Sequence, residues 1–162
     1  MGFDWLELPL ENPDDFDHET AAQIVKDNNL GVSACAVMGS ERDLIHEDKA
    51  VRDNGAAYIC AAVDALHTLG GSNLVGPIYS AVGRVWQQTS DERAKDIDLL
   101  VTQLTALSKY ATDKSVVLCL EPLNRFETSF INLASQAIEV VDRVDSDSCQ
   151  IMLDTFHMNI EE

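Results

Sequence analysis

Short apolar segments alternate with longer amphipathic ones along the whole chain, and this alternation limits the fold more than any other feature of the sequence. The apolar segments predict five strands, at residues 3–10, 32–38, 73–79, 115–120 and 150–153. The amphipathic segments predict four helices, over about residues 18–28, 48–69, 89–112 and 133–144. Such an alternation requires a parallel sheet with right-handed crossovers, either doubly wound or part of a (β/α)8 barrel.

Local signals support these boundaries. Thr89 and Glu92 have the spacing of a capping box and begin the third helix, whereas the pair Gly70-Gly71 ends the second. The run SVVLCL is apolar throughout, as expected for a parallel strand covered on both faces. Neither G-x-G-x-x-G nor G-x-x-x-x-G-K occurs, so nothing indicates the nucleotide site that often accompanies a doubly wound sheet.

The composition restricts the partners. The 162 residues suffice for one domain, which we place at residues 1–162. A formal net charge of −17, from 28 acidic and 11 basic residues, repels phosphate backbones and anionic lipid surfaces. We therefore expect no nucleic acid and no membrane as partners, which leaves small molecules. The four cysteines are far apart in the sequence, with no C-x-x-C pair, and no signal-peptide pattern occurs. Both features predict reduced thiols in a cytoplasmic protein.

Two carboxylates follow neighbouring strands. Glu121 comes directly after the fourth predicted strand, and Asp154 comes directly after the fifth. In parallel α/β architectures the carboxyl ends of the strands meet at one rim, where the functional site lies. Two like charges there need a shared proton or a cation, and a hard divalent ion is the simplest compensation. Either residue alone is better explained as a helix cap or as half of an ion pair.

Two further polar residues belong to the loops that follow the same strands. Glu127 and His157 can point into the rim, where a carboxylate and an imidazole hold sugar hydroxyls or relay protons. The structural alternative for Glu127 is capping of the next helix. For His157 it is a loop histidine bound to backbone.

Two motifs carry a family resemblance. LEPLNRFET, which contains Glu121 and Glu127, and LDTFHMNIEE, which contains Asp154 and His157, resemble the ketose 3-epimerases. These are the D-tagatose, D-allulose (psicose) and L-ribulose 3-epimerases of the xylose isomerase-like barrel superfamily. DLIHEDKAVRDNGAAYI and GFDWLEL also resemble segments of this family, so the similarity extends through the whole chain.

The resemblance implies a (β/α)8 barrel with a divalent ion, most commonly Mn²⁺ but also Mg²⁺ or Co²⁺, at the carboxyl rim. It implies that Glu121 and Asp154 are metal ligands, that Glu121 is also a catalytic acid/base, and that Glu127 and His157 bind substrate. In the family mechanism one carboxylate removes the C3 proton of a free keto-sugar and a second returns a proton to the opposite face. The ion stabilises the enediolate formed between the two steps.

The chain also departs from the family. A full barrel needs about 250 residues, and the five predicted strands correspond by resemblance to barrel strands two to six. We therefore expect a truncated chain that is inactive alone, and a homo-oligomer for the complete enzyme. Two alternatives remain. One is an aldose–ketose isomerase or hydroxypyruvate isomerase-like enzyme of the same superfamily; the other is a non-enzymatic barrel remnant that folds only with a partner chain.

Overall fold

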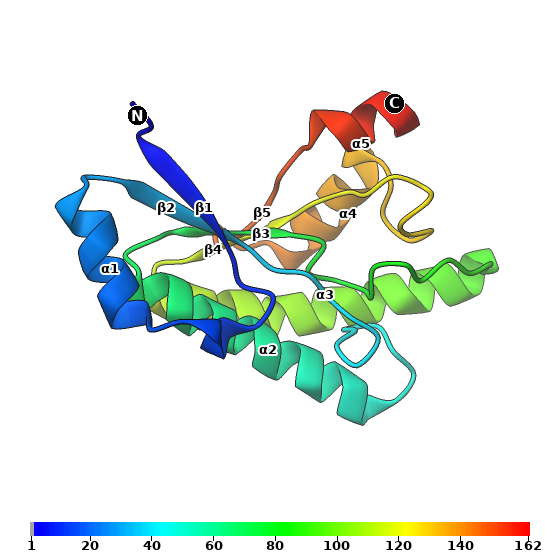
Figure 1. Cartoon of the computed structure of the whole chain (residues 1–162). Helices are drawn as coiled ribbons and strands as arrows, with labels where there is room; N and C mark the ends of the chain where they lie inside the picture. The colour runs from blue at the N-terminus through cyan, green and yellow to red at the C-terminus, as the bar shows by residue number, and fades with distance from the viewer. Residues whose placement is uncertain (1) are drawn as a thin grey trace.

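The computed structural model describes residues 2–162 and contains one five-stranded parallel sheet. The strands lie side by side in chain order, and each pairs with its sequence neighbours (Figure 1). Their bounds are β1 Trp5–Pro9, β2 Gly31–Cys35, β3 Asn73–Gly76, β4 Val117–Leu120 and β5 Cys149–Ile151. The predicted class, an α/β fold with five parallel strands of a partial barrel, is confirmed.

Helices connect the strands and lie along the convex side of the curved sheet (Figure 1). These helices are α1 His18–Asp27, α2 Lys49–Thr68, α3 Ser90–Asp113 and α4 Ala134–Val144, with a short 3-10 turn, η1 Pro13–Asp15, before α1. A fifth helix, α5 Thr155–Glu161, follows β5 at the opposite side of the molecule from α2 and α3 (Figure 1). The four predicted helices are present, and the Thr89–Glu92 capping box begins α3. The sequence pattern did not predict α5. Among residues 2–162, no helix has the length and apolarity that a membrane crossing requires.

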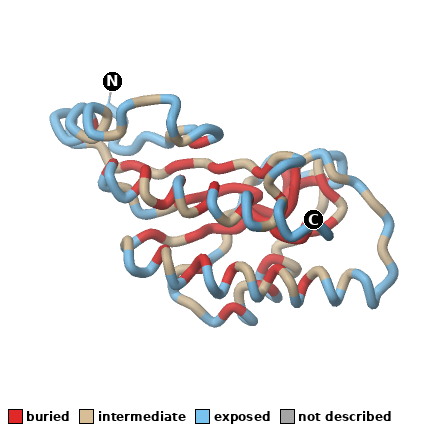
Figure 2. Tube along the Cα trace, turned by 90° about the horizontal axis from the view of Figure 1, so that it is seen from below, coloured by how far each residue is buried: buried red, intermediate tan, exposed pale blue. Residues whose placement is uncertain are grey.

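The strand register separates two faces of the sheet. Ala34, Leu74 and Leu118 align across three neighbouring strands and pack into the hydrophobic core. Ile59 and Leu104 of the covering helices belong to the same core, and Figure 2 shows buried residues along the strands and along the inward sides of the helices. This single layer between sheet and helices contains most of the buried apolar side chains.

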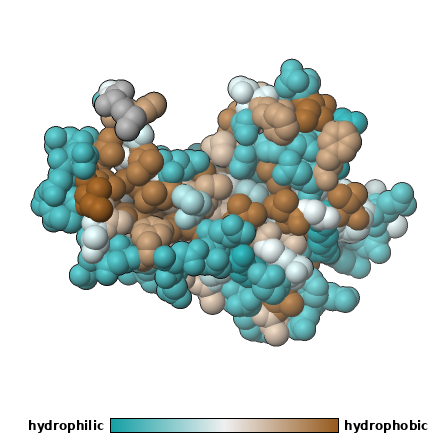
Figure 3. Space-filling view, viewed as in Figure 1, coloured by the Kyte–Doolittle hydropathy of each residue, from teal (hydrophilic) through white to brown (hydrophobic). Residues whose placement is uncertain are grey.

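The opposite, concave face is more open. Val75 and Cys119 are buried there outside the main core, whereas Trp5 of β1 remains 60% exposed. Within residues 2–162, β1 pairs only with β2 and β5 only with β4, so both edges of the sheet are unpaired. Figure 3 shows hydrophobic side chains around β1 and in the hollow between the N-terminal strand and the C-terminal segment. The sheet is thus an open arc rather than a closed cylinder.

Gly76 ends β3 earlier than the apolar run predicted. Its φ of 128° suits glycine, and a Cβ at this position would lie 2.2 Å from the carbonyl oxygen of Ala36. The missing side chain therefore lets β2 and β3 approach each other at their carboxyl ends. The carbonyl oxygen of Gly76 accepts a hydrogen bond of 3.0 Å from the backbone N–H of Glu121. Gly76 consequently helps to place the first predicted site residue.

We expect Gly76→Ala to lower the free energy of unfolding by about 3 kcal/mol or more, because the new methyl group meets a backbone oxygen that cannot move freely. Gly70→Ala is the matched control. Gly70 also has a positive φ, of 76°, but a Cβ added there would have no neighbour within 4 Å, so we expect a loss of only about 1–2 kcal/mol. Urea unfolding measures both losses, and equal losses would contradict the steric role of Gly76.

Candidate metal centre

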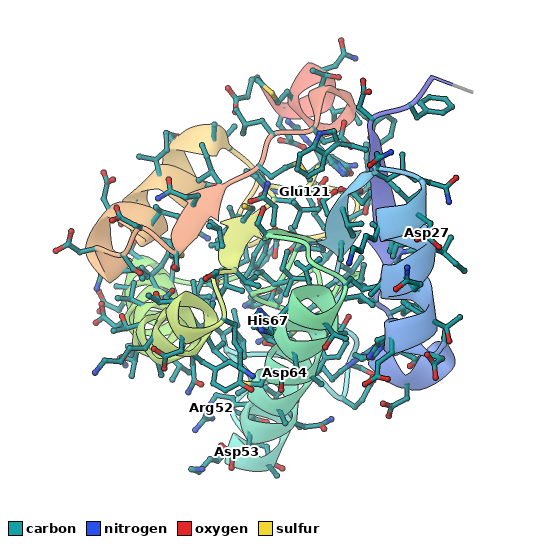
Figure 4. All side chains as sticks on the ribbon, turned by 90° about the vertical axis from the view of Figure 1, so that its left-hand side faces the viewer. Asp27, Arg52, Asp53, Asp64, His67 and Glu121 are labelled. Atoms are coloured by element: carbon teal, nitrogen blue, oxygen red, sulfur yellow. The ribbon has the colours of Figure 1, made fainter. Side chains whose placement is uncertain are left out.

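The structure brings Glu121, Asp154 and His157 together beyond the carboxyl ends of β4 and β5. Each offers a ligand atom, and these atoms all lie within 4.8 Å of one another. The Nε2 atom of His157 lies 3.6 Å from Glu121 Oε1 and 4.0 Å from Asp154 Oδ2. In Figure 4, Glu121 lies near α5, apart from the α2 residues Arg52 and His67. The three side chains form one group, and its two carboxylates can hold a metal ion with His157 beside them.

Asp154 serves two purposes with its two oxygens. It is the N-cap of α5, and its Oδ1 atom accepts a hydrogen bond of 2.7 Å from the backbone N–H of Phe156. Its Oδ2 atom faces His157. The helix-cap explanation and the metal-ligand explanation of Asp154 are therefore compatible, since each uses a different oxygen. The cap also explains why a helix, rather than a loop, carries His157.

The loop after β4 connects the remaining predicted residue to this group. Glu127 Oε1 accepts a hydrogen bond of 2.8 Å from the side-chain amide of Asn124 and lies 3.9 Å from His157 Nδ1. Glu127 does not cap the following helix, because the N-cap residue of α4 is Leu133. Glu127 is half-buried, whereas His157 is only 8% exposed. All four predicted site residues thus lie in one cluster.

The cluster has a strong excess of negative charge. Burial raises the pKa of Glu121 to about 7, and the nearby carboxylates of Asp154, Glu7 and Glu127 contribute to this shift. Glu121 is 7% exposed, so water screens its charge poorly. A divalent cation between Glu121 and Asp154 would relieve both the desolvation and the repulsion, and their oxygen donors suit a hard ion such as Mg²⁺ or Mn²⁺. The residues present therefore fit a divalent metal.

The last two glutamates of the chain hold the loops and helices around the site. Glu161 accepts hydrogen bonds from the backbone N–H of Arg125 at 2.6 Å and from its guanidinium at 2.8 and 2.9 Å. Glu162 accepts one of 2.8 Å from the backbone N–H of Ala134, at the start of α4. Both carboxylates have structural partners, and neither belongs to the acidic cluster.

Sequence reasoning gave no role to two residues that support the site. The hydroxyl of Tyr79 is buried and donates to the carbonyl oxygens of Glu121 and Ile131, at 2.9 and 3.3 Å. Asn124 is 2% exposed and contacts both Glu127 and His157. An amide inside the EPLNRFET loop was the only available signal for Asn124, because its partner His157 lies 33 residues away.

A separate cavity of about 660 Å³ lies beside the loops that follow β2 and β3. Asp43 and Arg84 line it and form an ion pair of 2.7 Å, in which the carboxylate is fully buried. None of the four predicted site residues lines this cavity. Its polar groups largely bind one another, and we therefore assign the chemistry to the carboxylate cluster instead.

The fold and the sequence have counterparts in known proteins. A family model described as xylose isomerase-like TIM barrel matches residues 1–162. The chain therefore belongs to the xylose isomerase-like TIM barrel family.

Within this family, the chain is 32% identical over 161 residues to the L-ribulose 3-epimerase of Methylomonas sp. (strain DH-1). It superposes with a TM-score of 0.92, at 32% identity, on a crystal structure of D-allulose 3-epimerase from Methylomonas sp. in complex with D-allulose. It is also 34% identical over 171 residues to the 3-dehydro-D-guloside 4-epimerase of Escherichia coli (strain K12). The predicted similarity to the ketose 3-epimerases is confirmed.

These alignments include nearly all of this chain but only part of the other proteins. They cover 99% of this chain and 55% of the Methylomonas L-ribulose 3-epimerase. For the D-allulose 3-epimerase structure the shares are 99% and 55%, and for the Escherichia coli enzyme they are 100% and 62%. The chain spans about half the length of the relatives it matches, which agrees with an open five-stranded arc.

We expect the metal-free protein to lose stability as the pH rises from about 5 to about 8. The pKa of Glu121 is about 7 in the folded state and its ordinary value is 4.5. At low pH the carboxyl is neutral in both the folded and the unfolded state. At high pH it is ionised in both, and only in the folded state is the charge buried. Relative to low pH, the free energy of unfolding is lower by on the order of 3 kcal/mol at the upper end of this range.

Thermal unfolding across this pH range, with a chelator present, measures the effect. Glu121→Gln should flatten the dependence, whereas Glu139→Gln, a change at an exposed position of α4, should leave it unchanged. Excess Mg²⁺ at pH 8 should stabilise the unsubstituted protein more than Glu121→Gln. Identical pH slopes for all three proteins would refute the desolvation of Glu121.

Proposed function

We propose that the complete protein is a metal-dependent ketose 3-epimerase, which inverts C3 of free keto-sugars through an enediolate. One observation carries this proposal: Glu121 and Asp154 face a common point at the ends of adjacent parallel strands, with His157 within 4.0 Å of both. The similarity of nearly the whole chain to an L-ribulose 3-epimerase supports the assignment of this site to sugar chemistry.

In this proposal Glu121 and Asp154 hold the divalent ion, for which Mn²⁺ is the first choice and Mg²⁺ or Co²⁺ are alternatives. When bound, the ion would stabilise the negative charge that develops on the sugar oxygens during proton transfer. Glu121 also acts as an acid/base in this proposal, since a carboxyl group at the rim beside the bound sugar can accept and return a proton. Glu127 and His157 bind the sugar oxygens and orient the C3 hydrogen.

Inversion at C3 requires two bases, one on each face of the sugar, and Glu121 supplies one of them. We assign the second base to a residue outside residues 2–162, and we expect the isolated chain to be inactive for this reason. The complete protein would take a small ketose as its partner rather than nucleic acid or membrane. We also propose that it is a cytoplasmic homo-oligomer.

The first test uses a chain completed with the remaining strands of a matched 3-epimerase, supplied with Mn²⁺ and D-fructose, D-allulose or D-tagatose. Glu121→Gln should lower kcat by at least about 1000-fold, since it removes both a metal ligand and the acid/base group. Glu139→Gln on the exposed side of α4 should retain the activity. Retained turnover in Glu121→Gln would overturn the proposed role of Glu121.

The sugar carbon at which the reaction takes place distinguishes the competing activities. Products resolved by chromatography distinguish C3 inversion from the C1–C2 isomerisation of an aldose–ketose isomerase. Inversion at C4 would instead favour the chemistry named for the Escherichia coli relative. The isolated chain should produce none of these products, and robust C3 inversion by it would contradict the need for a second base from outside.

A further inference from the structure

Asn124 has a side-chain amide whose orientation is fixed by the backbone. The backbone N–H of Phe126 lies 2.9 Å from Asn124 Oδ1. A backbone N–H can only donate, so the atom facing it must be the amide oxygen. The NH2 group of Asn124 consequently faces Glu127 Oε1, at 2.8 Å, and His157 Nδ1, at 2.9 Å. Asn124 is 2% exposed, so water does not compete for these contacts.

The same reasoning determines which nitrogen of His157 carries the hydrogen. The backbone N–H of Asn124 lies 3.1 Å from Nδ1, and the side-chain NH2 of Asn124 lies 2.9 Å from the same atom. Both groups are donors, so Nδ1 must accept and has no hydrogen. In a neutral imidazole the hydrogen is then on Nε2. Nε2 is the nitrogen that faces Glu121 and Asp154.

The amide of Asn124 also prevents the more usual arrangement. A metal-binding histidine commonly donates its other ring N–H to a carboxylate, which leaves the metal-facing nitrogen free to bind the ion. Glu127 is the obvious carboxylate for such a pair, but its Oε1 atom lies 3.9 Å from His157 Nδ1. One amide hydrogen of Asn124 goes to each of them, so Glu127 and the ring both accept from Asn124.

We propose that Asn124 is a positioning residue that fixes His157 as the Nε2–H tautomer, so that His157 presents a hydrogen-bond donor, not a third metal ligand, to the space beside Glu121 and Asp154. The use of this donor for a sugar oxygen rests on the epimerase function proposed above. The tautomer itself depends only on the contacts of Asn124 and can be tested without any turnover.

The test is nitrogen NMR of the full chain labelled with ¹⁵N-histidine, in which the ring nitrogens of the two tautomers have distinct shifts and couplings. His157→Gln identifies the signals of His157 among the four histidines. The Nε2–H form of His157 should exceed the Nδ1–H form by about tenfold or more, the ratio that one net hydrogen bond provides. An even mixture, or an excess of Nδ1–H, would overturn the proposal.

Asn124→Asp replaces the donor beside Nδ1 by an acceptor of the same shape, and it should shift His157 toward the Nδ1–H form by about tenfold. Asn132→Asp is the matched control, because Asn132 lies in the same loop but its side-chain amide donates to the carbonyl oxygens of Leu123 and Thr128 and not to His157. It should leave the tautomer of His157 unchanged. An unchanged tautomer in Asn124→Asp would show that the side chain of Asn124 is not the determinant.

Metal titration provides a second measurement. On addition of excess Mg²⁺, the Nε2–H signal of His157 should persist in the unsubstituted chain. In Asn124→Asp the Nε2 lone pair becomes free, and Zn²⁺, which favours imidazole ligands, should shift the Nε2 signal more strongly than it does in the unsubstituted chain. Loss of the Nε2 hydrogen from the unsubstituted chain on addition of Mg²⁺ would make His157 a metal ligand and refute the proposal.

Discussion

The parallel register of the sheet is the constraint on which the rest of the structure depends. Because Leu118 pairs with Cys149 and Leu120 with Ile151, the residues that follow β4 and β5 emerge at the same edge. Glu121 and Asp154 are therefore neighbours although 33 positions separate them in the sequence. The hydrophobic core between the sheet and the helices holds this register, so apolar packing determines the distance between two charged groups.

The acidic cluster is unfavourable for the folded chain without a cation, and its supports show how it is held in place. The carbonyl group of Gly76 and the hydroxyl of Tyr79 contact Glu121, and the side-chain amide of Asn124 contacts Glu127 in the loop that begins at Glu121. None of these three groups adds a net charge. They restrain the backbone and the side chains while leaving the electrostatic field of the carboxylates uncompensated, which is the condition under which a cation binds strongly.

Much of this arrangement could be predicted from the sequence, and the parts that could not have a common cause. Periodicity indicated the strands and the four long helices, because burial on one side produces a repeating pattern. Polar residues directly after strands indicated Glu121 and Asp154. The role of Asn124 depends on His157, which comes close only after folding, so no local pattern could reveal it. The early end of β3 at Gly76 likewise depends on the approach of Ala36 from another strand. The helix α5 was within reach of sequence reasoning, since Asp154 is a favourable N-cap residue.

The two oxygens of Asp154 connect the start of α5 with the acidic cluster at the rim. Oδ1 begins α5, and Oδ2 faces the acidic cluster. A cation bound at Oδ2 would restrain the same carboxylate that caps the helix, and an ordered α5 would in turn restrain the carboxylate that meets the cation. By thermodynamic reciprocity each equilibrium favours the other to the same extent. Amide-exchange protection of α5 would therefore increase when a cation occupies the rim site that this helix borders.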